Sequence, residues 1–155
     1  MVLQAWPKLQ AAVEDPTMKA SGGCLCGAVR YEIDGEPVFA AHCYCRDCQK
    51  ATGAGHNSVL GMRREAVKVT GETKAYASSG DSGMPLTRSF CPNCGSMLFS
   101  EPTVLPGMIN ITAGTLDDLS VFQPQLAIYV RNRPDWDRLV GELAEFEVVP
   151  PRPPS

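Results

Sequence analysis

Short runs of alternating hydrophobic and polar residues fill the middle of the chain. The clearest is AVRYEI at 28–33, which puts Val29, Tyr31 and Ile33 on one face of an extended segment. The run RDCQKATG at 46–53 predicts one short helix that ends at Gly53. Many short strands with little helix indicate a mainly β domain. Further strands, separated by Gly, Pro, Asp and Asn, are predicted at 37–42, 57–62, 66–71, 73–78, 86–90, 96–100 and 108–114.

The pattern changes at both ends of the chain. Residues 1–20 form an N-terminal extension, in which an amphipathic spacing predicts a short helix limited by Pro7 and Pro16. The last residues, VVPPRPPS at 148–155, form a proline-rich tail that we expect to be extended or disordered. Because the intervening sequence shows neither repeats nor a linker, we expect a single domain at 21–147. The apolar positions of the predicted helix are Leu3, Trp6, Leu9 and Val13.

Composition narrows the class of partner. A chain of 155 residues that is 44% hydrophobic can bury one core, and its net charge of −3 argues against nucleic acid as a partner. Eighteen consecutive apolar residues occur nowhere, so we expect no membrane-spanning segment. The first twenty residues lack the charged and apolar regions of a secretory signal, so we expect a cytoplasmic protein. The oligomeric state is left open.

Seven cysteines dominate the candidate chemistry. An odd number of cysteines in the cytoplasm favours metal binding over disulfides. In FCPNCG, Cys91 and Cys94 have the spacing of a zinc knuckle, with Gly95 easing the turn. In GGCLCG, Cys24 and Cys26 would lie on the same face of an extended segment. These two pairs together supply four thiolates, which predicts a closed structural zinc site.

The stretch HCYCRDC holds the other three cysteines, Cys43, Cys45 and Cys48. Three protein ligands and one open position distinguish a catalytic zinc site from a structural one. Two alternatives stay open: His42 could close the site as a fourth ligand, or the trio could be a thiol cluster without metal. Neighbouring residues of a strand point to opposite faces, which argues against ligation by His42. We therefore expect an open second zinc site.

Four segments of the chain resemble one known family. GGCLCGAVRYEI, HCYCRDCQKATG, RSFCPNCGSMLF and AGTLDDL are similar to motifs of the glutathione-dependent formaldehyde-activating (GFA) family, which includes the centromere protein V type. The resemblance covers about residues 21–140 and implies a β-tent: antiparallel sheets pinned by a four-cysteine zinc. It assigns the structural zinc to Cys24, Cys26, Cys91 and Cys94, and the catalytic zinc to Cys43, Cys45 and Cys48. The family's activity joins formaldehyde to glutathione, giving S-hydroxymethylglutathione.

The chain departs from the family pattern beside the trio. Many members have a histidine where this chain has Tyr44, and an arginine where it has Gln49. Both changes leave the metal ligands intact but weaken the transfer of substrate identity. The resemblance thus implies a zinc-dependent carbon–sulfur lyase with an open choice of natural substrate. The alternative is a non-catalytic, zinc-stabilised binding protein on the same fold; a zinc-ribbon nucleic-acid module is disfavoured by the acidic charge.

A zinc ion held by three thiolates would bind a thiol substrate at its open position, because a soft metal site accepts a fourth sulfur. A metal-held thiolate that attacks an aldehyde leaves an oxyanion that needs a proton. His56 and Tyr44 are candidate acids by proximity in sequence, although a structural role is the simpler interpretation of each.

Glutathione also carries two carboxylates, which basic side chains would have to contact. Arg46 and Lys50, which flank the trio, are the first candidates for these glutathione contacts. We expect Trp136 to pack against the core, and Gly114, Leu116 and Asp117 in AGTLDDL to support a turn. Further candidates for the carboxylates are Arg63, Arg64, Arg131 and Arg133.

Overall fold

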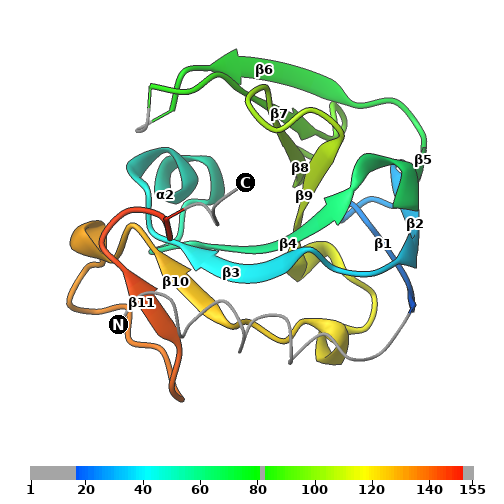
Figure 1. Ribbon diagram of the computed structural model, residues 1–155. Coiled ribbons are helices and arrows are strands. Elements are labelled where there is room, and N and C mark those ends of the chain that lie inside the picture. The colour runs from blue at the N-terminus through cyan, green and yellow to red at the C-terminus, as the bar shows by residue number, and fades with distance from the viewer. Residues whose placement is uncertain (1–16, 81–82, 152–155) are drawn as a thin grey trace.

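The computed structural model describes residues 17–80 and 83–151, and within them the mainly β fold is confirmed (Figure 1). The strands are β1 (Met18–Gly23), β2 (Arg30–Gly35), β3 (Phe39–Cys43), β4 (Asn57–Arg63), β5 (Val67–Thr70), β6 (Lys74–Ser78), β7 (Leu86–Phe90), β8 (Met97–Pro102), β9 (Met108–Thr112), β10 (Leu126–Ile128) and β11 (Ala144–Phe146). One α-helix, α2 (Arg46–Thr52), lies in the described part of the chain, together with four 3-10 turns: η2 (Arg64–Ala66), η3 (Ala113–Thr115), η4 (Leu119–Val121) and η5 (Val130–Asn132).

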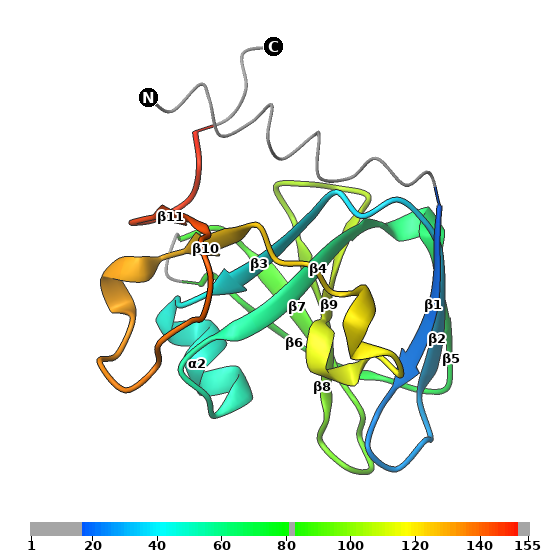
Figure 2. The ribbon, with the colours of Figure 1, turned by 90° about the horizontal axis from the view of Figure 1, so that it is seen from below.

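The strands form two sheets. A small antiparallel sheet has the order β1-β2-β5, and a large sheet has the order β11-β10-β3-β4-β9-β8-β7-β6. The large sheet is mixed, because β10 runs parallel to both β3 and β11, pairs that the expectation of antiparallel sheets did not include. Figures 1 and 2 show the small sheet at one end of the molecule, while the large sheet bends so that β6 and β7 arch over α2.

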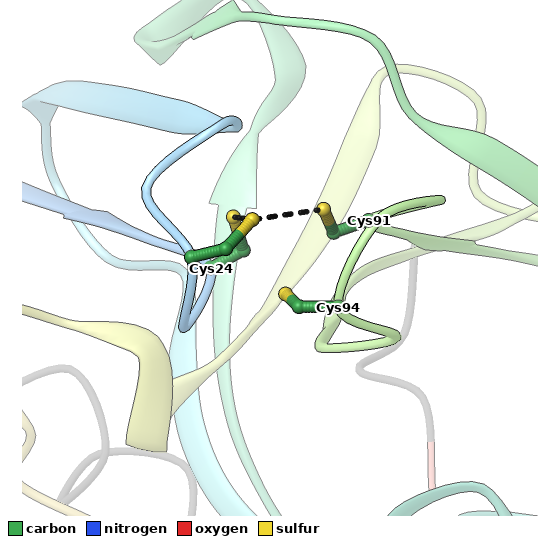
Figure 3. A group of neighbouring side chains, drawn as sticks. Cys24, Cys91 and Cys94 are labelled. Carbon is green, nitrogen blue, oxygen red and sulfur yellow. Dashed lines mark hydrogen bonds between the residues drawn. The ribbon is translucent and has the colours of Figure 1, made fainter.

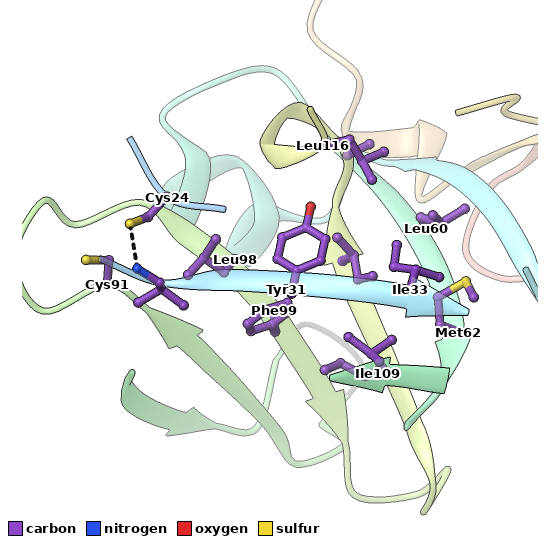
Figure 4. Packing of buried hydrophobic residues seen from close by; sticks show 14 of the residues in the cluster. Cys24, Tyr31, Ile33, Leu60, Met62, Cys91, Leu98, Phe99, Ile109 and Leu116 are labelled. Carbon is purple, nitrogen blue, oxygen red and sulfur yellow. Dashed lines mark hydrogen bonds between the residues drawn. The ribbon is translucent and has the colours of Figure 1, made fainter. Parts of the chain in front are cut away.

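The core lies between the two sheets. Val29, Tyr31 and Ile33 are buried as their alternation predicts, and the Tyr31 ring meets Phe99 edge-on with centroids 5.3 Å apart. Figure 4 shows Tyr31 in the middle of side chains contributed by β4, β8 and β9. Burying each of these large side chains stabilises the fold by about 1.5–3 kcal/mol. The other buried members from the large sheet are Leu60, Met62, Leu98, Ile109 and Ile111.

The opposite face of the large sheet carries a row of polar side chains next to apolar ones such as Val59 and Phe39. Residues paired directly across antiparallel strands share a face, so the pairs Gly61↔Asn110, Asn110↔Ser100 and Ser100↔Arg88 define one row across β4, β9, β8 and β7. On the same face, the pair Cys43↔Asn57 joins the ends of β3 and β4. The face that holds this polar row therefore also carries the first cysteine of the trio.

The two ends of the domain differ in detail from the sequence pattern. β1 begins at Met18 and pairs with β2, so the last residues of the 1–20 segment belong to a sheet. The predicted helix around Trp6 lies outside the described residues, as do the last four residues of the tail. Val148, the first tail residue, accepts a backbone hydrogen bond from Tyr129 at 2.8 Å. Among the described helices, none has the length and apolar character needed to cross a membrane.

Candidate metal centre

The two predicted cysteine pairs meet at one point between the sheets. Cys24 and Cys26 lie in the connection from β1 to β2, and Cys91 and Cys94 in the turn from β7 to β8. All four sulfurs lie within 4.8 Å of one another, with 3.6 Å between Cys24 and Cys26 (Figure 3). Tetrahedral zinc with Zn–S bonds of about 2.3 Å places sulfurs about 3.8 Å apart, and the Cys26–Cys91 separation is 3.8 Å. The four side chains thus fit a structural zinc ion.

The backbone at Cys24 and Cys26 is a turn, so the extended segment expected there is wrong. The Gly27 N–H donates to the Cys24 carbonyl at 3.1 Å, and Gly27 has a φ of 78°. The reason is geometric, since alternate residues of a strand lie about 6.6 Å apart along it, too far for sulfurs that share one ion. The turn brings the sulfurs together and leaves Leu25 88% exposed at its tip.

Hydrogen bonds to sulfur support the four-cysteine site. The Val29 N–H donates to Cys24 Sγ at 3.2 Å, and Asn93 Nδ2 donates to Cys26 Sγ at 3.1 Å. A hydrogen bond with the Ser96 hydroxyl helps lower the pKa of Cys94 to about 5. Donors arranged around the sulfurs stabilise thiolates, the form in which cysteine binds metal.

The trio assembles where β3 runs into α2. Cys43 ends β3, Cys45 caps the N-terminus of α2, and Cys48 follows in its first turn. Their sulfurs lie within 4.8 Å of one another, and all three residues are at least nine-tenths buried. The Cys48 N–H donates to Cys45 Sγ at 3.3 Å, and Gly53 ends the helix as predicted, with a φ of 70°. A seven-residue helix thus holds two of the three sulfurs at its first turn.

The electrostatics of the trio call for a cation. Hydrogen bonds with the Cys45 and Cys48 thiols, followed by burial, raise the pKa of Cys43 well above its usual value. The reciprocal bonds from Cys43 and Cys48 lower the pKa of Cys45 to about 3. Three buried sulfurs this close cannot all carry negative charge unless a positive ion balances them. The donor set fits Zn²⁺, which binds thiolates readily.

A fourth protein ligand does not join the trio within the described parts of the chain. His42 projects from the other face of β3, where its Nδ1 hydrogen-bonds Ser58 Oγ at 2.9 Å. Its ring packs against His56, with centroids 4.7 Å apart, and burial lowers its pKa to about 4. This geometry favours the open site over the alternative closed by His42.

The two candidate acids gather on that same side of β3. The rings of Tyr44 and His56 lie 5.2 Å apart, and His56 Nδ1 pairs with Asp137 Oδ2 at 2.6 Å. The sulfurs of Cys43 and Cys45 both lie on the side of Cys48. Tyr44, the residue between them, therefore projects to the opposite side. Sequence reasoning missed Asp137, which reaches His56 from 81 residues further along the chain.

The predicted basic residues are scattered over the surface. Arg46 and Lys50 lie on the exposed side of α2, and Arg46 bonds Gln49. Arg64 contacts Glu101 beyond the far end of β4, and Arg133 pairs with Glu145. Arg63 lies at the end of β4 opposite to Asn57, and Arg131 is exposed.

One basic residue beside the trio was missed by sequence reasoning. Arg88 on β7 is only 7% exposed, and its Nη2 lies 3.9 Å from Asp47 Oδ2 on α2. Hydrogen bonds from the other two thiols are the main cause of the low pKa of Cys45, and the charge of Arg88 adds to it. The available signal was its position in LTRSF, between Leu86 and Phe90 on one strand face.

Asp117 and Trp136 were both expected to have structural roles, and only Asp117 has the role expected. Asp117 does support the fold: it pairs with Arg30, and its N–H donates to the Ser21 carbonyl at 2.9 Å. Trp136 does not pack against the core, because it is 75% exposed. The surrounding loop turns Asp137 inward to His56 and leaves the indole at its tip.

Comparisons with known proteins agree with this geometry. Residues 19–132, more than half of the chain, match the family model described as "Glutathione-dependent formaldehyde-activating enzyme". A protein of Halomonas elongata named "Putative glutathione-dependent formaldehyde-activating enzyme" is 30% identical over 125 residues, which cover 77% of this chain and 80% of that protein. A crystal structure of a Rhodobacter sphaeroides protein matches with a TM-score of 0.50 at 21% identity, covering 63% of this chain and 87% of that one, a likeness of fold alone. On these matches, the chain belongs to the glutathione-dependent formaldehyde-activating (GFA) family.

Proposed function

We propose that the protein is a zinc-dependent carbon–sulfur lyase that forms or cleaves an aldehyde–thiol adduct of the S-hydroxymethylglutathione type. The observation that carries the proposal is the convergence of Cys43, Cys45 and Cys48 without a fourth protein ligand among the described residues. The family match and the name of the Halomonas relative support glutathione as the thiol and formaldehyde as the aldehyde.

The trio would hold the ion, and the ion would supply a position at which a substrate thiol loses its proton. The three thiolates would leave a Zn²⁺ centre with a formal charge of about −1, which suits a soft sulfur ligand better than the activation of water. All three cysteines are at least nine-tenths buried, which limits the access of water to their sulfurs. The chain's own contribution would therefore be to hold three converging sulfurs and to leave the fourth position on the ion to a substrate thiol.

The proposed reaction balances without an oxidant or reductant. The thiol loses its proton, the sulfur forms a bond to the aldehyde carbon, and the carbonyl oxygen gains a proton; cleavage is the reverse. We assign the delivery of that proton to water, because Tyr44 and His56 gather with His42 on the other side of β3. The His56–Asp137 pair then holds the loop of Asp137 against the side of β3 that faces away from the trio.

Exchange spectroscopy on equilibrium mixtures of glutathione and formaldehyde tests this proposal. The parent protein should accelerate the exchange between free glutathione and S-hydroxymethylglutathione, and Cys48→Ser should return it to the uncatalysed rate. Circular dichroism and a remaining zinc ion would show that the variant is folded. An uncatalysed rate with the zinc-loaded parent would contradict the enzyme and favour the non-catalytic binding protein.

We further propose a cytoplasmic location with small-molecule partners, a thiol and an aldehyde. The support is the arrangement of all seven cysteines as free thiols in two metal-type groups, which an oxidising compartment would not preserve.

A further inference from the structure

On the face of the large sheet that carries Cys43, two buried polar atoms have no hydrogen-bond partner among the described residues. They are Arg88 Nη2 on β7 and Asn57 Oδ1 on β4. Arg88 is 7% exposed and Asn57 is 4% exposed, so water does not replace the missing partners freely. Unpaired buried donors and acceptors cost free energy, which makes both atoms candidates for ligand contacts.

Both atoms border the trio from different strands. Asn57 pairs directly with Cys43 across β3 and β4, so its side chain shares a face with that sulfur. Arg88 approaches from the arching end of the sheet and meets α2 at Asp47, the residue before Cys48. Its Nη1 donates to Ser78 Oγ at 3.0 Å, which fixes the guanidinium and leaves Nη2 for another acceptor.

The surface between the two atoms carries polar side chains and is partly open. Asn110 and Thr112 on β9 are half-buried and lie on this face, and Asn110 donates to Ser100 Oγ at 3.4 Å. The row that contains Arg88 ends at its cross-strand partner Tyr76, which is 65% exposed. A ligand anchored at the trio could therefore extend along this face toward β7.

We propose that Arg88 and Asn57 form the binding site for the peptide part of the thiol substrate, with Arg88 contacting a carboxylate and Asn57 accepting an amide N–H. This assignment rests on the proposed function and names its substrate class: an anionic peptide thiol rather than a neutral or purely aliphatic one. The guanidinium matches a carboxylate in shape and charge. The Asn57 acceptor beside Cys43 matches the amide next to a cysteinyl thiol.

Calorimetric titration of three thiols into the zinc-loaded, full-length protein tests the site. Glutathione carries carboxylates and amides, its diethyl ester carries amides only, and 2-mercaptoethanol carries neither. Arg88→Gln should weaken glutathione binding on the order of ten- to a hundredfold and leave the other two ligands unchanged. Asn57→Leu should weaken glutathione and its diester alike and spare 2-mercaptoethanol.

Controls separate this proposal from a structural role and from failure of the proposed function. Arg88→Lys should restore part of the glutathione affinity, because it keeps the charge but not the planar fork. Arg88→Gln that weakens all three thiols equally, or none of them, would overturn the subsite while the proposed function stands. A parent protein that binds no thiol at all would overturn both.

Discussion

At the scale of single residues, Asp117, which follows η3, bonds to two strands of the small sheet. It pairs with Arg30 on β2 and accepts the Ser21 hydroxyl of β1 at 2.7 Å. These bonds, Arg30 first, lower the pKa of Asp117 to about 2 from 3.8. A depressed carboxyl pKa stabilises the fold fully above the unfolded value and loses that effect as pH falls through the folded value.

We therefore predict that Asp117→Asn lowers the melting temperature at pH 5 to 7. The difference from the parent should shrink as pH falls from about 4 toward 2. Loss of zinc in acid affects both proteins, so the difference between their thermal scans isolates the carboxylate. Asp34→Asn is the matched control: Asp34 makes an exposed pair with Lys19 at 3.8 Å and should change stability little. An equal loss in both variants would contradict the role of Asp117.

Residue spacing predicted which cysteines lie together but not their neighbours. The spacings C-x-C and C-x-x-C predict sulfurs that lie close enough to share an ion, because the cysteines of each pair are close in sequence. Arg88 and Asp137 reach their sites through strand pairing and loop packing over long separations, which leave no local signal. For the same reason, the exposed position of Trp136 could not be predicted from its hydrophobicity.

At the scale of elements, α2 depends on how it ends. Gly53 has a φ of 70°, and an added Cβ there would meet no atom within 4 Å. The cost of a side chain at this position is therefore conformational alone. We predict that Gly53→Ala destabilises the protein by about 1 kcal/mol.

Chemical denaturation of Gly53→Ala checks this prediction, with Gly114→Ala as its control. Gly114 also has open space around an added Cβ, but its φ is not positive, so that variant should unfold like the parent. Since α2 holds Cys48, Gly53→Ala should also weaken metal retention at the trio before it affects the four-cysteine site. Unchanged stability in Gly53→Ala would argue against the left-handed end of the helix.

Strand alternation predicted β2 and most of the large sheet, because one face of each strand is buried and the other is not. It did not predict β10 and β11. Each has three residues, too few for a period of two to stand out, and both are positioned by parallel pairing. The turn at Cys24 was missed because the C-x-C spacing alone does not distinguish an extended segment from a turn that brings both sulfurs together.

At the scale of the whole molecule, the four-cysteine site links the two sheets. Cys24 follows a strand of the small sheet, and Cys91 follows a strand of the large one. Structural zinc sites supply about 10–16 kcal/mol of apparent binding free energy in small zinc peptides. Loss of such an ion therefore favours unfolding. The trio lies within one sheet and its adjoining helix, and its loss should leave the fold standing.

This difference predicts unequal effects of two substitutions. Cys94→Ser should lower the melting temperature strongly, whereas Cys48→Ser should shift it by only a few degrees. Differential scanning calorimetry on both variants, with and without added zinc, provides the measurement. Equal destabilisation would mean that both ions are structural, as in the binding-protein alternative.

We propose above all that one molecule holds a closed zinc site and an open one. The most direct test is zinc content per chain on freshly reduced parent protein and on Cys48→Ser, with glutathione titrated into each. We predict about two zinc ions in the parent, about one in the folded variant, and thiol binding to the parent alone. One zinc ion in both proteins, without thiol binding, would show that Cys43, Cys45 and Cys48 hold no working metal and would contradict the account.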